Sequence, residues 1–146
     1  MKKINGIFLT IIVFTMMFTG CSFNHKIINK LPDQSIETVY GGGYGYMFLT
    51  AGGDVYTYGR TQNFGQSGIY FLGVKDAERL DVPTKILSDV VKICDNQGMP
   101  AAITSDGDLY VWGYNGSSQR LGFNPDIEIV WEPTKWMEAV ADVGWG

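Results

Sequence analysis

The chain has 146 residues, with 11 Lys and Arg against 15 Asp and Glu, and this length leaves room for one domain at most. Hydrophobic residues make up 45%, aromatic residues 14%, and there are 19 Gly, which excludes a charge-driven disordered chain and favours a small all-β fold over a helical bundle. All the acidic residues lie beyond residue 20, so the folded part is acidic. We therefore expect no nucleic-acid partner, which would select for a basic surface.

Residues 1–20 are predicted to be a lipoprotein signal peptide. Lys2-Lys3 precedes an apolar stretch over residues 7–18 that is too short to span a bilayer comfortably. The stretch ends in Phe18-Thr19-Gly20-Cys21, which resembles the bacterial lipobox, with Phe where that family usually carries Leu. The resemblance implies cleavage between Gly20 and Cys21 and a diacylglyceryl thioether on Cys21. Two acyl chains anchor a protein stably, which predicts an exported chain held on the extracytoplasmic face of the membrane. An uncleaved or ordinarily cleaved signal is the alternative.

Residues 21–35 are predicted to be a tether, because they are polar and basic and contain Pro32. They also contain His25, the one histidine of the chain. With Cys21 modified by lipid, Cys94 has no partner for a disulfide within the chain. Cys94 ends an apolar run that begins at Val90, so we interpret it as a small buried hydrophobe and not as a nucleophile.

The remaining chain repeats itself. Residues 47–59 align with residues 101–113 at a constant shift of 54, with five identities in thirteen positions. Further on, Val82-Pro83-Thr84-Lys85 aligns with Glu132-Pro133-Thr134-Lys135 at a shift of 50, and the residues that follow begin a third copy. We predict repeat 1 over 36–87, repeat 2 over 88–137 and the start of repeat 3 over 138–146.

Each copy reads as antiparallel strands joined by tight turns. Gly52-Gly53 and Asp106-Gly107 suit type I′ hairpin turns, which need positive φ at both central residues. Gly65-Gln66-Ser67-Gly68 and Gln119-Arg120-Leu121-Gly122 read as the return turns of the two copies. Asp106 and Asp108 could in principle bind calcium, but the first copy offers only Asp54, so we expect no metal.

Alternating aromatic residues follow each hairpin. Their period of two places each pair on one face of its strand, where we expect packing between adjacent sheets in preference to stacking with a sugar or a base. A glycine then ends each strand where backbones approach closely. The repeat-motif residues to which we assign structural roles are Gly53, Asp54, Tyr56, Tyr58 and Gly59 in the first copy, and Gly107, Asp108, Tyr110, Trp112 and Gly113 in the second.

These residues carry a family resemblance. The segment Asp106-Gly107-Asp108-Leu109-Tyr110-Val111-Trp112-Gly113, followed by the turn at 119–122 and by Pro133, resembles the repeat of the regulator of chromosome condensation (RCC1). The first copy also fits, with Tyr58 in place of Trp and Ser67 in place of Leu, so that residues 36–146 are covered. The resemblance implies a partial β-propeller made of two four-stranded blades and an incomplete third.

Two blades cannot close a ring, because closed propellers use about four to eight blades. An isolated pair would leave a broad apolar face at each end, larger than soluble monomers tolerate. Three explanations remain open: a truncated remnant, which the stop within a repeat favours, self-association through the exposed blade faces, or a partner that supplies further blades.

We expect a non-catalytic, lipid-anchored binding or scaffold module without cofactors, whose partner is a protein or the cell wall. Binding would reside in the connections at 60–63, 70–81 and 114–119, although these could equally be solvated links. One alternative is a cell-envelope enzyme that acts on glycan through paired carboxylates, which would be Asp89 with Asp95 or Asp126 with Glu128. A histidine-based triad lacks its base within the folded region. The resemblance also implies guanine-nucleotide exchange, which in the family depends on a complete ring and an inserted element with no counterpart here.

Overall fold

The computed structural model describes residues 35–42, 44–61, 72–95, 98–116, 121–122 and 126–144. The predicted signal peptide, Cys21 and all but the last residue of the predicted tether lie outside these ranges. Within them the chain forms strands, and no helix is long and apolar enough to cross a membrane. The eight strands are β1 (Ile36–Gly42), β2 (Gly45–Thr50), β3 (Val55–Arg60), β4 (Arg79–Leu87), β5 (Val90–Asp95), β6 (Pro100–Thr104), β7 (Leu109–Tyr114) and β8 (Ile129–Met137).

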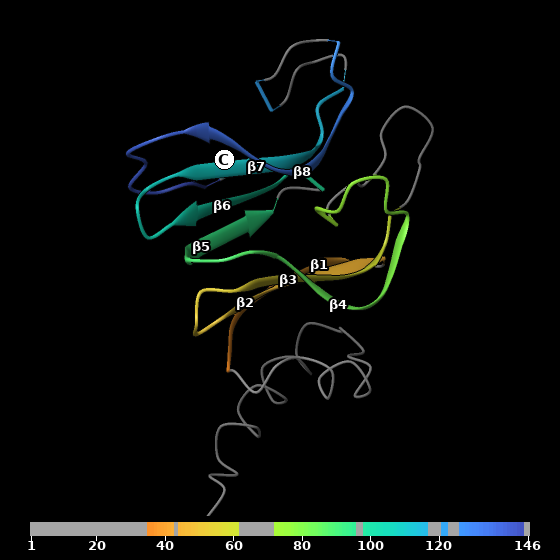
Figure 1. The fold of residues 1–146 in the computed structure, drawn as a ribbon, viewed down its shortest axis with the longest axis horizontal. Helices are drawn as coiled ribbons and strands as arrows, with labels where there is room; N and C mark the ends of the chain where they lie inside the picture. Colours follow the sequence, from red (N-terminus) through yellow and green to blue (C-terminus); the bar gives the residue numbers. More distant parts are fainter. Residues whose placement is uncertain are drawn as a thin grey trace, which may run out of the picture. The chain divides into compact units, whose positions relative to one another are not determined.

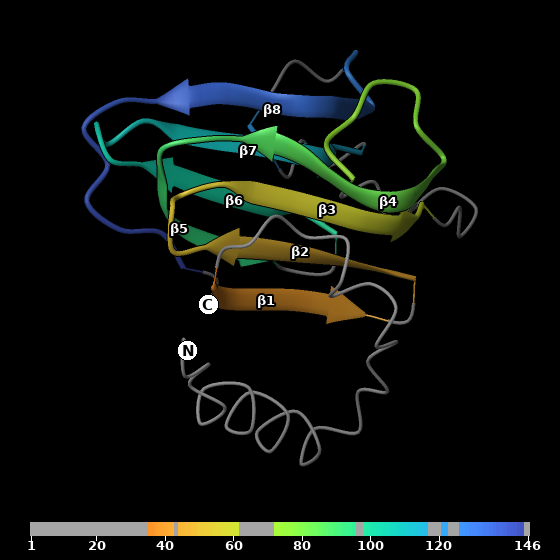
Figure 2. The same ribbon diagram turned by 60° about the horizontal axis from the view of Figure 1, so that its bottom comes forward.

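The strands form two four-stranded antiparallel sheets, each with its strands in chain order (Figures 1 and 2). We refer to the sheet β1-β2-β3-β4 as blade 1 and to the sheet β5-β6-β7-β8 as blade 2. Both belong to one compact unit that covers Leu31–Gly146. The predicted all-β class with four strands per repeat is confirmed.

The two blades share their pairing register. Leu49 pairs with Val55 across the β2–β3 hairpin, and Ile103 pairs with Leu109, 54 residues later, across the β6–β7 hairpin. The outer strands β4 and β8 carry the same irregularity, which in β8 lies between Val130 and Thr134 and contains Pro133. Proline has no N–H to donate to a ladder, so its place at a bulge in an outer strand is the one that a sheet tolerates.

The hairpin turns differ from the type I′ prediction. Within the β2–β3 loop only Gly53 has a positive φ, 79°, and within the β6–β7 loop only Gly107 does, at 82°. Each glycine N–H donates to the carbonyl of the threonine three residues earlier, Thr50 or Thr104, in both cases over 2.9 Å. The turn is therefore a three-residue loop closed by one left-handed glycine. The threonine hydroxyl accepts the N–H of the following aspartate, over 3.1 Å in the first loop and 3.2 Å in the second, and so replaces one backbone bond of the hairpin.

One hydrophobic core joins the two blades. Val55 of β3 and Met47 and Leu49 of β2 belong to the same buried cluster as the inward residues of blade 2. Cys94 is buried in this cluster, as predicted. Trp112 of β7 is 0% exposed and faces blade 1, because its indole Nε1 would lie 3.2 Å from a Cβ placed on Gly73, the residue that follows Leu72. The Trp112 indole is thus the largest side chain buried between the blades.

The chain after β8 returns to blade 2 in the way that β5 meets blade 1. The Val140 N–H donates to Gly107 O over 2.9 Å, and the Val90 N–H donates to Gly53 O over the same distance. The preceding residues have left-handed backbones, with φ of 60° at Asp89 and 56° at Ala139. Residues 139–144 therefore enter the position that the first strand of a further blade would take.

The apolar face expected beyond blade 2 is smaller than predicted. Leu109 and Val111 lie on the face of β7 opposite to Trp112, yet each is only 3% exposed. Part of their cover comes from Val140 and Val143, which pack against the core cluster. The remaining exposed apolar side chains of blade 2 are addressed below.

Candidate binding surface

The aspartates of the repeat motif are engaged in ion pairs within each blade. Asp54 at the start of β3 pairs with Lys85 of β4 at 2.8 Å, and Asp108 pairs with Lys135 of β8 at 2.9 Å. The hydrogen bond with Asp54 raises the pKa of Lys85, and hydrogen bonds with Glu138 and Asp108 raise the pKa of Lys135. The pairs join the third and fourth strands of each blade. The repeated Pro-Thr-Lys was the sequence signal for them, and our sequence reasoning did not connect it to the aspartates.

The glycines that end β3 and β7 lie where backbones meet. Gly59 has a φ of 120° and Gly113 has a φ of 107°, a region that favours glycine. A Cβ on Gly59 would overlap Tyr44 O, and a Cβ on Gly113 would overlap Gly98 O. Both glycines thus occupy the close approach that was assigned to them.

The aromatic pairs of the two copies differ in their surroundings. Trp112 packs between the blades, and Tyr110 is partly buried against the core. Tyr56 and Tyr58 are half-buried and lie on the face of β3 opposite to Val55, which points toward blade 2. The predicted packing between sheets is therefore observed at Trp112, while Tyr56 and Tyr58 face away from blade 2.

The return turn of the first copy lies elsewhere than predicted. Residues 65–68 fall outside the described residues, but Leu72-Gly73 has the properties of Leu121-Gly122. Both leucines are buried, and both glycines are left-handed, with φ of 68° and 73°. A Cβ on Gly73 would lie 2.8 Å from Ile86, and one on Gly122 would lie 2.8 Å from Trp136, the residue at the shift of 50. The two Leu-Gly pairs are thus structurally equivalent, and the connection 70–81 contains a buried anchor at Leu72, whose carbonyl accepts the Thr57 hydroxyl.

The structure does not bring Asp89 and Asp95 together. They flank β5 at its opposite ends, so about six residues of extended strand, roughly 20 Å, separate them. Burial raises the pKa of Asp95, and the backbone N–H groups of Gly98 and Met99 oppose this shift by donating to the carboxylate. Asp126 and Glu128 are both exposed before β8. Among the described residues, no three His, Cys, Asp or Glu side chains gather in a way that could hold a metal ion.

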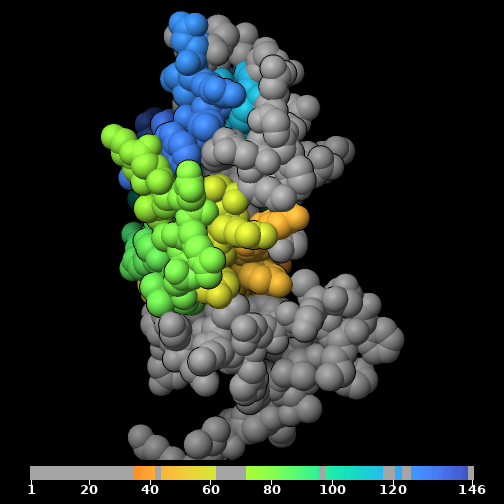
Figure 3. All heavy atoms as spheres, turned by 90° about the vertical axis from the view of Figure 1, so that its right-hand side faces the viewer, coloured from red at the N-terminus to blue at the C-terminus, as the bar shows by residue number. Residues whose placement is uncertain are grey.

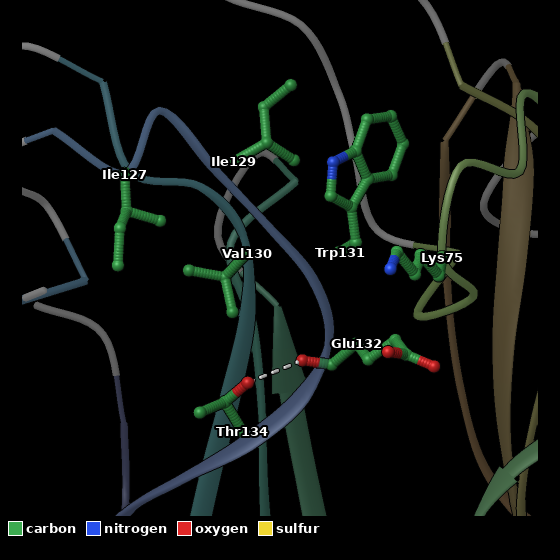
Figure 4. Close-up of a pocket in the computed structure, with 7 residues that line it drawn as sticks. All are labelled: Lys75, Ile127, Ile129, Val130, Trp131, Glu132 and Thr134. Carbon is green, nitrogen blue, oxygen red and sulfur yellow. Dashed lines mark hydrogen bonds between the residues drawn. The ribbon is translucent and has the colours of Figure 1, made fainter.

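A groove of about 290 Å³ lies along β8 (Figure 4). Lys75, from the segment before β4, lines it from the side opposite to Ile127. The Thr134 hydroxyl donates to Glu132 O over 2.9 Å within the bulge of β8. The lining residues are Lys75, Ile127, Ile129, Val130, Trp131, Glu132 and Thr134. The walls are therefore aliphatic and aromatic, with one cation and one carboxylate among them.

Buried polar contacts shape the groove. Asn115 is 0% exposed, and its side-chain amide donates to Ile127 O over 2.7 Å while its Oδ1 accepts the Leu121 N–H over 3.2 Å. The segment before β8 is thereby fixed to the end of β7. Figure 3 shows the side of the molecule on which the segment before β4 (green) and the segment of β8 (blue) lie next to each other. The predicted connection 70–81 supplies Lys75, but the residues of β8 were not foreseen, since nothing in their sequence marks a groove.

Comparison with known proteins shows relatives much longer than this chain. No family model matches the chain. Human E3 ubiquitin-protein ligase HERC2 is 31% identical over 121 residues, which are 75% of this chain and 2% of the ligase.

Solved structures share the fold. Human WBSCR16 matches with a TM-score of 0.59 and 23% identity over 74% of this chain and 27% of its own. Prp20p from Saccharomyces cerevisiae, in a study of its binding to Gsp1p and histones, matches with a TM-score of 0.60 and 20% identity over 75% of this chain and 27% of its own. Yeast RCC1 (Prp20) bound to Kap60 matches with a TM-score of 0.61 and 19% identity, over 75% and 26%.

The chain therefore spans about a quarter of the solved chains that it matches. Two four-stranded blades in the same register, the repeated Asp-x-aromatic-x-aromatic-Gly strand and these matches agree with one another. The fold is that of a partial β-propeller, and the chain belongs to the RCC1 repeat family.

Proposed function

We propose that this chain is a non-catalytic protein-binding module, held on the outer face of a bacterial membrane by lipid on Cys21. The observation that carries the binding role is the division of labour among its side chains. The motif aspartates, threonines and glycines hold the blades together, whereas the groove along β8 leaves aliphatic and aromatic groups accessible.

The groove suits a protein segment. Apolar walls with Lys75 and Glu132 beside them would accept an aliphatic or aromatic side chain together with charged groups of either sign. Protein partners also appear in the titles of the matched yeast structures, where Prp20 binds Gsp1p and histones and is bound to Kap60. This similarity supports a protein partner in preference to a small molecule.

A site-specific photocrosslinker tests the groove. We would place benzoylphenylalanine at Trp131 in living cells and, as the control, at Val82, which is exposed in the bulge of the other outer strand, β4. A protein crosslinked from position 131 and not from 82, and whose purified form binds at least tenfold more weakly to Ile129→Asp, is the expected result. Equal crosslinking from both positions would contradict the proposal.

The anchor is tested separately. In a bacterial host fed an alkyne fatty acid, the chain should take up label and sediment with membranes, and Cys21→Ala should lose the label. Protease added to intact outer-membrane-permeabilised cells should digest the chain. Unchanged labelling of the Cys21→Ala variant, or protection from protease, would refute the anchor while leaving the groove hypothesis open.

A further inference from the structure

The end of β8 carries two exposed apolar side chains. Trp136 is 43% exposed and Met137 is 46% exposed. Their counterparts in blade 1, at the shift of 50, are Ile86 and Leu87 at the end of β4, and these pack against the core cluster. The same two positions are thus covered in the blade that has a following blade and open in the blade that is followed only by residues 138–146.

The contact between blades 1 and 2 shows what covers these positions. A Cβ on Gly73 would lie 2.8 Å from Ile86 Cδ1 and 3.2 Å from Trp112 Nε1. Trp112 of blade 2 therefore reaches the same glycine as Ile86 of blade 1. Blade 2 rebuilds the first half of this contact, because Gly122 lies against Trp136 in the same way.

The chain also carries the second half. Tyr58 holds in blade 1 the strand position that Trp112 holds in blade 2, 54 residues later. It lies on the face of β3 that points away from blade 2, and it is half-buried, as is Tyr56 beside it. One molecule thus presents Trp136 with Met137 at one end and Tyr56 with Tyr58 at the other.

We propose that copies of this chain associate head to tail, with Trp136 and Met137 of one copy packed against the Tyr56 and Tyr58 face of a second copy. The contact repeats the one between blades 1 and 2, with Tyr58 in the role of Trp112. Because the two surfaces differ, the contact is heterologous and builds a ring if its rotation closes and a filament if it does not. The proposal depends neither on the lipid anchor nor on the groove along β8.

Residues 139–144 lie where the first strand of the incoming blade would go. They are held by the Val140 N–H bond to Gly107 O and by the ion pair between Lys92 and Asp142, both of which are exposed side chains. Exposed ion pairs stabilise little, so β1 of the second copy can displace this segment. Asp142→Ala should therefore lower the concentration at which copies associate, and a higher concentration would contradict the displacement.

The decisive experiment uses complementary variants of the full chain in detergent, with oligomeric state measured by light scattering and sedimentation. The unaltered chain should form oligomers, whereas Trp136→Asp alone and Tyr58→Asp alone should each raise the concentration for half-association at least tenfold. A mixture of the two variants should form a 1:1 dimer, since each keeps one intact half. Val82→Asp, an exposed apolar position in β4, is the matched control and should associate like the unaltered chain.

Three results would overturn the proposal: an unaltered chain that is monomeric throughout, a mixture that stays monomeric, or Tyr58→Asp that still associates while Trp136→Asp does not. The last would indicate a symmetric contact through the Trp136 face. Circular dichroism melting of each variant reports folding. If Tyr58→Asp fails to fold, Tyr58→Ser paired with Trp136→Asp provides the same test with a smaller change.

Discussion

The contact between the two blades predicts a large and asymmetric effect of truncating the two aromatic positions. Trp112 is 0% exposed between the blades, whereas Tyr58, its counterpart in blade 1, is half-buried on the outward face. We consider Trp112→Ala with Tyr58→Ala as its matched control, in dilute solution where copies do not associate. The two changes remove similar chemistry from equivalent strand positions, so any difference reflects the neighbouring blade.

The magnitude follows from burial. A fully buried Trp removes about 200 Å² of mostly apolar surface from water, worth roughly 5 kcal/mol at about 25 cal/mol per Å². Truncation to Ala leaves a cavity beside Gly73, Ile86 and Pro133, so a loss of about 3–5 kcal/mol in the free energy of unfolding is expected. The half-buried Tyr58 should lose about 1–2 kcal/mol by the same reasoning.

Urea denaturation followed by circular dichroism measures both losses. At about 4 °C per kcal/mol for a domain of this size, Trp112→Ala should also lower the melting temperature by at least about 12 °C. The reasoning would be refuted if Trp112→Ala cost no more than Tyr58→Ala, because the blade contact would then contribute nothing beyond the strand itself.

Three further predictions concern single positions. Gly113→Ala should cost about 2–5 kcal/mol, because it combines a positive φ with overlap of Gly98 O, whereas Gly144→Ala, whose Cβ would meet nothing within 4 Å, should change urea stability by under about 0.5 kcal/mol. Asn115→Leu should cost about 2–4 kcal/mol, since two buried backbone groups lose their partners, and a loss below about 1 kcal/mol in the same assay would argue against a structural role for the amide. Burial raises the pKa of Asp95 above 3.8, so the folded state holds its proton more tightly than the unfolded chain, and the ionised carboxylate costs stability above the raised pKa. Asp95→Asn should therefore be more stable than the unaltered chain at about pH 7 and lose this advantage at about pH 3, and an advantage that grows on acidification would reverse the sign.

Much of the architecture could be predicted from the sequence because it is local. The hairpin between Leu49 and Val55 and its copy 54 residues later follow from short apolar runs on either side of a glycine turn. The burial of Cys94 follows from the apolar run that it ends. Such features depend on neighbours in the chain, which the sequence records directly.

Local reasoning was wrong where geometry depended on one backbone angle or on an insertion. Gly52-Gly53 suggested two left-handed residues, but the Thr50 hydroxyl takes the place of one backbone bond and one left-handed glycine suffices. Spacing favoured Gly68 as the match of Gly122, whereas Gly73 has the equivalent φ and the equivalent contact. Sequence alignment counts residues, and an insertion in a connection moves the match without changing the contact.

The sequence by itself determined that the chain repeats, which strands each repeat contains, and which polar and aromatic residues recur. Only the tertiary structure decided what those residues do. Asp54 meets Lys85, Trp112 is buried while Tyr58 is half-buried, and Ile86 is covered while Trp136 is open. The reason is that burial and pairing are set by the element that lies alongside, which here is the next strand for the ion pair and the next blade for the aromatic and aliphatic side chains.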